Sequence, residues 1–214
     1  MGAEADAWLA ENANLVNHLA VTGTADAPVV FETALDADHP HALTCLTIDA
    51  AEGSSLTVVQ VVRGDAEDGV SANLTRIRAA EGAHVVLVQV QLLGSHARRW
   101  NAVSIEQGKS ARVEQVRIEL GGAVVACGTR TLLNHNKCEY DLDAVYFGHG
   151  SDVLDFNDVS VHTGKDTLCE MHTAGVLTGH ADKILRGTVD FQRGAKRGVG
   201  HESEDVLLFS PNAR

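Results

Sequence analysis

The sequence contains few aromatic residues, few prolines and no long apolar run. Aromatic residues make up 4% of the 214 residues, and there are 3 prolines. No segment approaches the roughly 18 uninterrupted apolar residues that a membrane-spanning helix requires, and residues 1–20 carry acids where a secretory signal has a basic start and an apolar core. We therefore expect a cytoplasmic protein with no membrane partner. With 44% hydrophobic residues, a chain of this length is expected to fold on its own as one domain.

Sequence motifs for catalysis are also missing. Gly108-Lys109-Ser110 ends like a phosphate-binding loop, but Val103 stands where the first glycine of that motif must be. The GxSxG and HExxH motifs do not occur, so hydrolase and zinc-protease chemistry have no local support. We expect no enzymatic activity from this chain alone. If nucleotide hydrolysis drives its function, a partner ATPase supplies it.

The four cysteines lie far apart and form no CxxC pair. This spacing indicates neither a disulfide framework nor a zinc knuckle, and we expect reduced thiols. They could serve as thiol acceptors or cluster ligands, but a buried cysteine in a valine-rich strand is usually a small, inert hydrophobic residue. The residues are Cys45, Cys127, Cys138 and Cys169.

Basic residues are scarce in the first third of the chain. The formal net charge is −12, and residues 1–70 contain 12 acidic residues and one base, Arg63. An acidic surface repels phosphate backbones, so nucleic-acid binding is disfavoured.

A helical pattern is confined to the start of the sequence. Trp8, Leu9, Leu15 and Leu19 form a loose apolar stripe, which predicts a short helix between Glu4 and Ala20. From about residue 28 the apolar residues alternate with period two, as in strands. We therefore divide the chain into residues 1–27, an N-terminal helix and linker, and residues 28–214, an all-β core domain.

A repeat runs through the second half of the sequence. Turn markers recur at intervals of 14 or 15 residues, and each one precedes an alternating apolar run. One marker is an asparagine, which we expect to adopt the left-handed backbone that glycine permits. The markers are Gly108, Gly122, Asn136, Gly150, Gly164, Gly179 and Gly194.

An interval of 14 residues holds one strand and one turn, with no room for a helix. Two intervals make a coil of about 28–30 residues, and stacked coils form a parallel β-helix of flattened section. The alternative is an antiparallel sandwich, whose hairpins favour Asn-Gly or Asp-Gly turns. Asp68-Gly69 is the one such pair in the chain, so the β-helix is the preferred architecture.

The coil length brings histidines together. Asp143, His172 and His201 are spaced 29 and 29 residues apart, so we expect them in one column on adjacent strands. We expect the column to face outward, because its apolar neighbours take the opposite parity. Imidazole and carboxylate suit zinc or iron, and the alternative is a solvated surface ladder. The residues expected to face inward are Leu142, Val159, Cys169 and Met171.

Residues 172–196 and Glu202–Ser210 resemble the core of the SufB/SufD family of SUF-system scaffold proteins, which assemble iron–sulfur clusters. The most specific elements are Arg186-Gly187 with Ala195, and a closing Leu-Leu-x-Ser-x-x-Ala segment. Weaker similarity reaches back to about residue 50. The closing segment consists of Leu207, Leu208, Ser210 and Ala213.

The resemblance implies a right-handed parallel β-helix and a non-catalytic scaffold, closer to SufD than to SufB. Such a scaffold pairs with a second copy or with its SufB/SufD paralogue, is served by the SufC-type ABC ATPase, and holds an iron–sulfur cluster transiently in the full assembly. Family members continue past the closing segment into a stretch that carries cluster-assembly residues and an ATPase-binding helical region. The sequence stops at Arg214, so none of those residues has a counterpart to assign, and we expect a fragment of a longer scaffold.

Two other functions fit a β-helix. A carbohydrate-active enzyme of this fold would project acids and bases into a groove with aromatic sugar platforms, but only 2 Trp and 2 Tyr are available. A purely structural dimerisation module needs no chemistry at all.

Overall fold

Each interval between turn markers forms one strand. The computed structural model describes residues 3–214. Its elements are α1 (Ala3–Asn12), β1 (Leu15–Val21), β2 (Val29–Leu35), β3 (His41–Ala50), β4 (Ser55–Gly64), β5 (Val70–Ala79), β6 (His84–Leu93), β7 (Arg98–Gln107), β8 (Arg112–Glu119), β9 (Val124–Leu133), β10 (Glu139–Gly148), β11 (Val153–His162), β12 (Leu168–Leu177), β13 (Asp182–Phe191) and β14 (Val199–Leu208).

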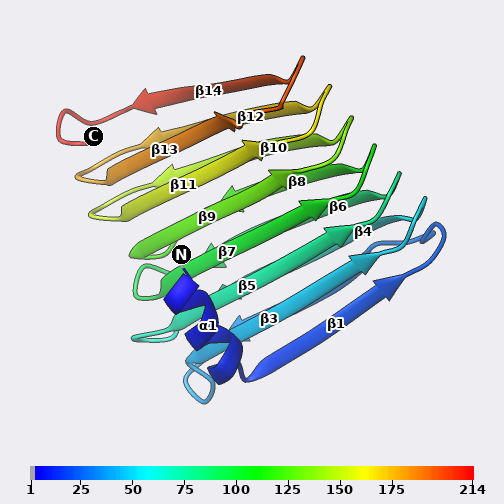
Figure 1. Ribbon diagram of the computed structural model, residues 1–214. Coiled ribbons are helices and arrows are strands. Elements are labelled where there is room, and N and C mark those ends of the chain that lie inside the picture. The colour runs from blue at the N-terminus through cyan, green and yellow to red at the C-terminus, as the bar shows by residue number, and fades with distance from the viewer. Residues whose placement is uncertain (1–2) are drawn as a thin grey trace.

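Successive strands alternate between two sheets of seven strands. The odd-numbered strands, from β1 to β13, form sheet A, and the even-numbered strands, from β2 to β14, form sheet B. Each strand pairs in parallel with the strand two places along the chain, as at β10 and β12 or β11 and β13. Figure 1 shows the resulting stack of coils. This topology confirms the parallel β-helix and excludes the antiparallel sandwich.

The coil step varies along the stack. Paired residues lie 29 apart between β10 and β12, but 26 apart between β7 and β9 and 31 apart between β12 and β14. Turns of different length absorb the difference. At the asparagine marker the left-handed residue is Lys137, with φ of 61°, and not Asn136 as expected. The Asn136 side chain instead accepts a hydrogen bond from the backbone N–H of Lys165 in the next coil, at 3.0 Å.

The N-terminal helix is shorter than expected. It ends at Asn12, and the second half of the expected range, Leu15–Val21, is strand β1, paired with β3. Asn14 begins this pairing, because its backbone N–H donates to the carbonyl of Leu43 at 2.9 Å and its side-chain oxygen accepts from the Leu43 N–H. Strand β1 therefore belongs to sheet A although it precedes residue 28, where the sequence predicts the solenoid to begin.

Helix α1 lies across the outer face of sheet A, over β3 and β5 (Figure 1). Leu9 is its buried anchor, packed in a cluster with Cys45, Leu74 and Ala102. No helix in the described part of the chain is long and apolar enough to cross a membrane.

The interior of the solenoid is apolar along both edges and polar along its middle. One apolar cluster includes Ile48, Ile77 and Ile105, near the ends of the sheet A strands. Smaller clusters occupy the opposite edge, with Leu93 in one and Leu154 in another. Between them, buried polar side chains run from coil to coil, and these define the candidate site.

Candidate functional site in the solenoid interior

The expected histidine column is correct at two of its three positions. Asp143 and His172 are register partners on β10 and β12, and the Nδ1 of His172 lies 3.8 Å from Oδ1 of Asp143. His201 is outside the column, because the 31-residue step to β14 places it beside Glu170. Its Nδ1 hydrogen bonds Glu170 Oε1 at 2.8 Å.

The side chains of His172 and Asp143 are 47% and 72% exposed, as expected of an outward ladder. His172 also hydrogen bonds Asp205 through Nε2, at 3.2 Å. Across residues 3–214, no three His, Cys, Asp or Glu side chains converge as metal ligands. Metal binding by Asp143 and His172 stays a prediction.

The prediction of which residues face inward is also correct for all but one residue. Leu142, Cys169 and Met171 are buried in the interior. Val159 is turned outward instead, because Asp158 and Ser160 on either side of it are the buried residues of β11, at 3% and 0% exposure. A carboxylate therefore occupies the interior where an apolar side chain was expected.

The buried polar side chains form a belt of amides and hydroxyls through the first coils. The Nε2 of Gln89 donates to Gln60 at 2.8 Å and to Asn101 at 3.1 Å. Gln115 donates to Gln89 at 3.1 Å and accepts from the hydroxyl of Tyr140 at 2.9 Å. Buried polar groups need such partners, since an unpaired one costs about 1–3 kcal/mol.

In the middle coils the belt becomes ionic. Arg117, on β8, makes two hydrogen bonds to the carboxylate of Asp158, on β11, at 2.9 and 2.8 Å. The side chains are 1% and 4% exposed, and Arg117 also lies over the ring of Phe156, 5.1 Å from its centroid. Burial lowers the pKa of Arg117, but the charge and hydrogen bonds of Asp158, together with the electrostatic influence of Cys127 and Glu119, outweigh burial, so the pKa is raised and the guanidinium stays charged.

A second buried pair adjoins the first. The Nε of Arg99 lies 3.2 Å from Oε2 of Glu119, and these side chains are 4% and 1% exposed. The other carboxylate oxygen of Glu119 accepts a hydrogen bond from the thiol of Cys127, at 3.3 Å. The thiol is therefore influenced by Glu119 and both guanidinium groups, and Asp158 pairs with one of these. We call these five residues the ionic cluster: Arg99, Arg117, Glu119, Cys127 and Asp158.

The thiol of Cys127 is held in its protonated form. Burial raises its pKa well above the usual range, and the carboxylate of Glu119 adds to the increase, whereas Arg117 and Arg99 act against it. The protonated thiol suits its role as a donor to Glu119. If the thiol became an anion, the two guanidinium groups would be positioned to stabilise it.

The other cysteines lie in packing positions. The thiol of Cys138 points at backbone carbonyls in a turn, including that of His135 at 3.0 Å. Burial raises the pKa of Cys169 to about 11, and Cys45 lies under α1 with Leu9. Among the four, only Cys127 adjoins charged interior side chains.

A small cavity lies beside the polar belt, between the strands of the first coils. It measures about 170 Å³, and Gln60, Asn73 and Arg99 contribute to its wall. That volume holds several water molecules at about 30 Å³ each. Because Arg99 also contacts Glu119, one side chain separates the cavity from the partner of the thiol.

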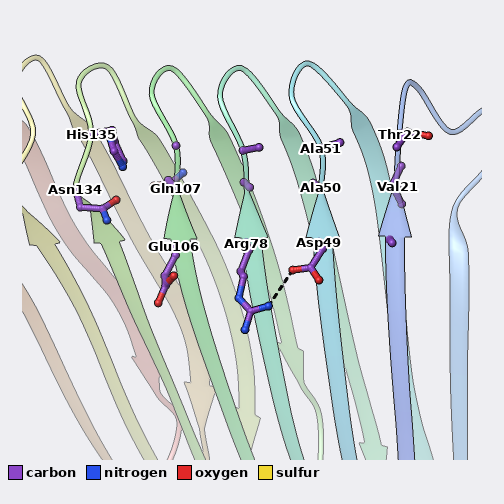
Figure 2. A pocket seen from close by; sticks show the side chains of 14 residues that line it. Val21, Thr22, Asp49, Ala50, Ala51, Arg78, Glu106, Gln107, Asn134 and His135 are labelled. Carbon is purple, nitrogen blue, oxygen red and sulfur yellow. Dashed lines mark hydrogen bonds and ion pairs between the residues drawn. The ribbon is translucent and has the colours of Figure 1, made fainter.

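A second hollow lies on the outside, where the strands of sheet A end. Figure 2 shows Asp49 and Arg78 pointing toward each other from neighbouring strands, with Glu106 beside them. Arg78 Nη1 donates to Asp49 at 3.3 Å, and Asp49 also pairs with His18 at 2.6 Å. Asp49 thus has two partners, Arg78 and His18, and much of the remaining wall is alanine and backbone. The hollow therefore offers little chemistry compared with the ionic cluster.

Sequence reasoning missed the four charged residues of the ionic cluster. A usable signal was present in β8, where Arg117 stands between Val116 and Ile118 and shares its parity with the buried Val113 and Gln115. A charged residue at the inward parity of a central strand is a candidate functional residue, because burying it is costly.

Most of the chain matches a known family. The family model described as "SUF system FeS cluster assembly, SufBD core domain" matches residues 33–214. The matched range contains the whole ionic cluster. No curated protein matches the chain.

Proposed function

This chain belongs to the SufBD core family of SUF iron–sulfur cluster assembly, and from that membership we propose that it is a scaffold subunit of a SUF assembly complex. It turns over no substrate by itself. It pairs with a second copy or with its SufB/SufD paralogue, and a SufC-type ABC ATPase supplies nucleotide hydrolysis. The overall resemblance implies a scaffold closer to SufD than to SufB, so we assign the chain the SufD-like position.

The ionic cluster is the observation that carries a chemical role. Replacing a buried ion pair by apolar residues of similar volume is often neutral or stabilising, so stability alone does not account for two such pairs. A solenoid built only as a spacer would be filled by valine and leucine, as the edges of this interior are. We infer that the cluster serves Cys127.

The thiol of Cys127 is suited to accept sulfur from a persulfide donor, R–S–SH. The inner S–S bond of the donor breaks, the donor leaves as R–SH, and Cys127 becomes Cys127–S–SH, so atoms and electrons balance. A persulfide is more acidic than a thiol, and Arg99 and Arg117 would stabilise its anion. Because the thiol is buried and protonated in the closed solenoid, transfer requires the coils around it to open.

The last coil supports pairing with another solenoid. Within residues 3–214, β13 and β14 each pair with a single strand. Their side chains include exposed apolar residues, among them Ile184 at 52% and Leu208 at 55%. An open edge with apolar side chains favours the addition of strands from a partner.

The two other functions inferred from the sequence are now weaker. The family's role in cluster assembly gives no support to a carbohydrate-active enzyme. A purely structural dimerisation module remains the competitor. It predicts that the ionic cluster is replaceable without loss of function.

Co-expression with the SufC-type ATPase and the paralogue of the same organism tests the scaffold. We expect the three proteins to purify together, and iron and sulfide to be retained in proportion to the complex. If neither protein associates with the full-length chain, the scaffold proposal is wrong.

Substitution of single cysteines tests the chemistry in the same complex. We expect Cys127→Ser to lose most of the bound sulfide while the complex still assembles. Cys138→Ser, at a thiol that is also buried but faces backbone carbonyls, is the matched control and should retain it. If both variants retain the same amount of sulfide, only the dimerisation module is left as an explanation of the chain's role.

A further inference from the structure

The outer face of sheet B carries a broad apolar surface, bordered on β10 and β12 by Asp143 and His172, which continue the row of Val116. Val59, Val88 and Val116 are register partners on three neighbouring strands. A second row joins Val61, Val90, Ile118 and Val145 in the same way. We call this surface the valine face; it consists of Val59, Val61, Val86, Val88, Val90, Leu92, Val116, Ile118, Leu120, Val145, Phe147 and Val176.

Nothing in the described part of the chain covers the valine face. Helix α1 lies on sheet A, and Leu92, Leu120 and Val145 at the centre and rim of the face are 46%, 43% and 46% exposed. Scattered apolar residues on a surface are ordinary, but contiguous patches of several hundred Å² mark interaction sites.

The surface under α1 shows what a helix requires on this solenoid. Its seat on sheet A combines the small residues Cys45, Ala72 and Ala102 with Leu74, and Leu43 and Trp100 pack beside them. The valine face is built mostly from β-branched side chains and is wider, with at least three rows of residues. A single helix about 10–12 Å across covers about two rows, which lie about 7 Å apart on one side of a strand. A second sheet fits this surface better than one helix does.

We propose that the valine face packs against the valine face of a second copy of this chain. Strands β4 to β12 span about 24 Å at 4.8 Å per strand, and ten residues of strand span about 33 Å. The valine face together with its polar rim therefore measures roughly 800 Å², which is what one partner contributes to a standard interface. Two such sheets would pack about 10 Å apart with their side chains interdigitated.

The two-fold axis of this pairing runs along the strands. That orientation sets the apolar rows of one copy against those of the other, whereas an axis along the stack would set them against the polar ends of the strands. Those ends carry His84, Arg112, Glu114 and Asp141, which are already paired within the chain. They form a polar rim on one side of an apolar centre.

Charge predicts an unusual salt dependence. Each copy has a formal charge of −12, so two copies repel one another at long range. Salt screens this repulsion and leaves the apolar contact intact. The assembly should therefore become tighter as ionic strength rises, which is the opposite of an interface held by ion pairs.

Sedimentation equilibrium of the purified chain tests the proposal. We expect Val88→Lys to halve the mass of the assembly, whether or not the open end at β13 and β14 is also engaged. The double variant Val88→Thr with Val116→Thr keeps the β-branched shape and should weaken association without disturbing the strands. Val153→Lys is the matched control, since Val153 is 45% exposed on the outer face of sheet A, and it should leave the mass unchanged.

Several outcomes would overturn the proposal. These are a monomeric wild-type chain, a mass that Val88→Lys does not change, or association that weakens with added salt. The chain could instead stay monomeric while a helical partner, or neutral phosphatidylcholine vesicles, protects the valine face. That result would assign the valine face to a different occupant. Circular dichroism on each variant confirms that the solenoid is folded. The inference does not depend on Cys127, so Cys127→Ser should assemble like the wild type.

Discussion

In the middle of strand β6, the two sides differ in the opposite sense from a typical sheet. Its outward side chains include Val86, Val88 and Val90, whereas Gln89 and Gln91 face the interior and are completely buried. In most sheets with one solvated face, the apolar residues point inward and the polar residues outward. Here the inside of sheet B holds a polar belt and the outside holds the valine face.

The comparison separates two uses of the same sheet. The polar residues inside hydrogen bond one another from coil to coil and lead to buried charges and a thiol, which favours chemistry. In residues 3–214, helix α1 packs on sheet A and the apolar outer side of sheet B is left uncovered, which favours docking. Each departure from the usual pattern marks a separate function, and each can be tested by a substitution on one side with a matched change on the other.

The largest effect is expected from breaking the buried ion pair. Asp158→Ala leaves the guanidinium of Arg117 buried without its partner and removes the acceptor for the Thr129 N–H. We expect a loss of about 3–5 kcal/mol in the free energy of unfolding, measured by urea denaturation. Asp155→Ala is the control on the outward side of the same strand, where the carboxylate pairs with Arg186.

Because Asp155 and Arg186 are each more than 40% exposed, the control should cost about 0–1 kcal/mol. The double variant Asp158→Leu with Arg117→Met, which replaces the pair by apolar groups, should recover most of the stability. If Asp158→Ala costs no more than Asp155→Ala, the interior charges are solvated and the comparison fails.

A smaller effect is expected from reversing polarity on β6 itself. Gln89→Leu makes the interior more apolar, yet it removes the partner of Gln60, Asn101 and Gln115. We expect a loss of about 1–3 kcal/mol, because the remaining amides are left without hydrogen bonds. Val88→Thr, one residue away on the outer side, should change the unfolding free energy by about 0.5 kcal/mol or less. Dilute samples keep the chain monomeric, and equal costs for both substitutions would contradict the assignment of sides.

The smallest effect is a pH dependence from an interior histidine. His162 is buried with hydrogen bonds to Ser160 and Thr167, and burial lowers its pKa below the usual 6.5. Between the lowered pKa and 6.5 the unfolded chain binds more protons than the folded one, so stability falls as pH decreases through this window. His162→Phe should flatten the pH dependence of the urea midpoint. The outward His172→Phe serves as control, and a profile in which the two variants behave alike would remove His162 as the cause.

The fold could be predicted because turns are local. Seven markers at near-constant spacing, each followed by an alternating run, specify strands and coils without knowledge of any distant contact. The exact register could not be predicted in this way. A turn can be two residues longer and still contain the same type of marker residue. The step to β14 is 31 residues instead of 29, and this difference moves His201 out of the column.

The ionic cluster was beyond the reach of the alternation pattern for a physical reason. Alternation identifies the inner side of a strand only when one side is apolar and the other is not. In β8 both sides carry valine or isoleucine, and in β11 Val159 and Val161 point outward while Asp158 and Ser160 point inward. Because the outer face is also apolar, the alternation pattern does not show which side of these strands faces the interior. For this reason the sequence identifies neither the polar belt nor the valine face.

The stacked arrangement also determines how the chain can come apart. Backbone hydrogen bonds join each coil to the coils before and after it and to no others. Unravelling must therefore begin at a terminal coil and proceed one rung at a time. Cys127 lies on β9, with β11 and β13 above it and four strands of sheet A below. Amide hydrogens should exchange fastest at both ends and slowest near β7, the central strand of sheet A. A reagent should reach the thiol of Cys127 only after the coils that contain β13 and β11 have opened.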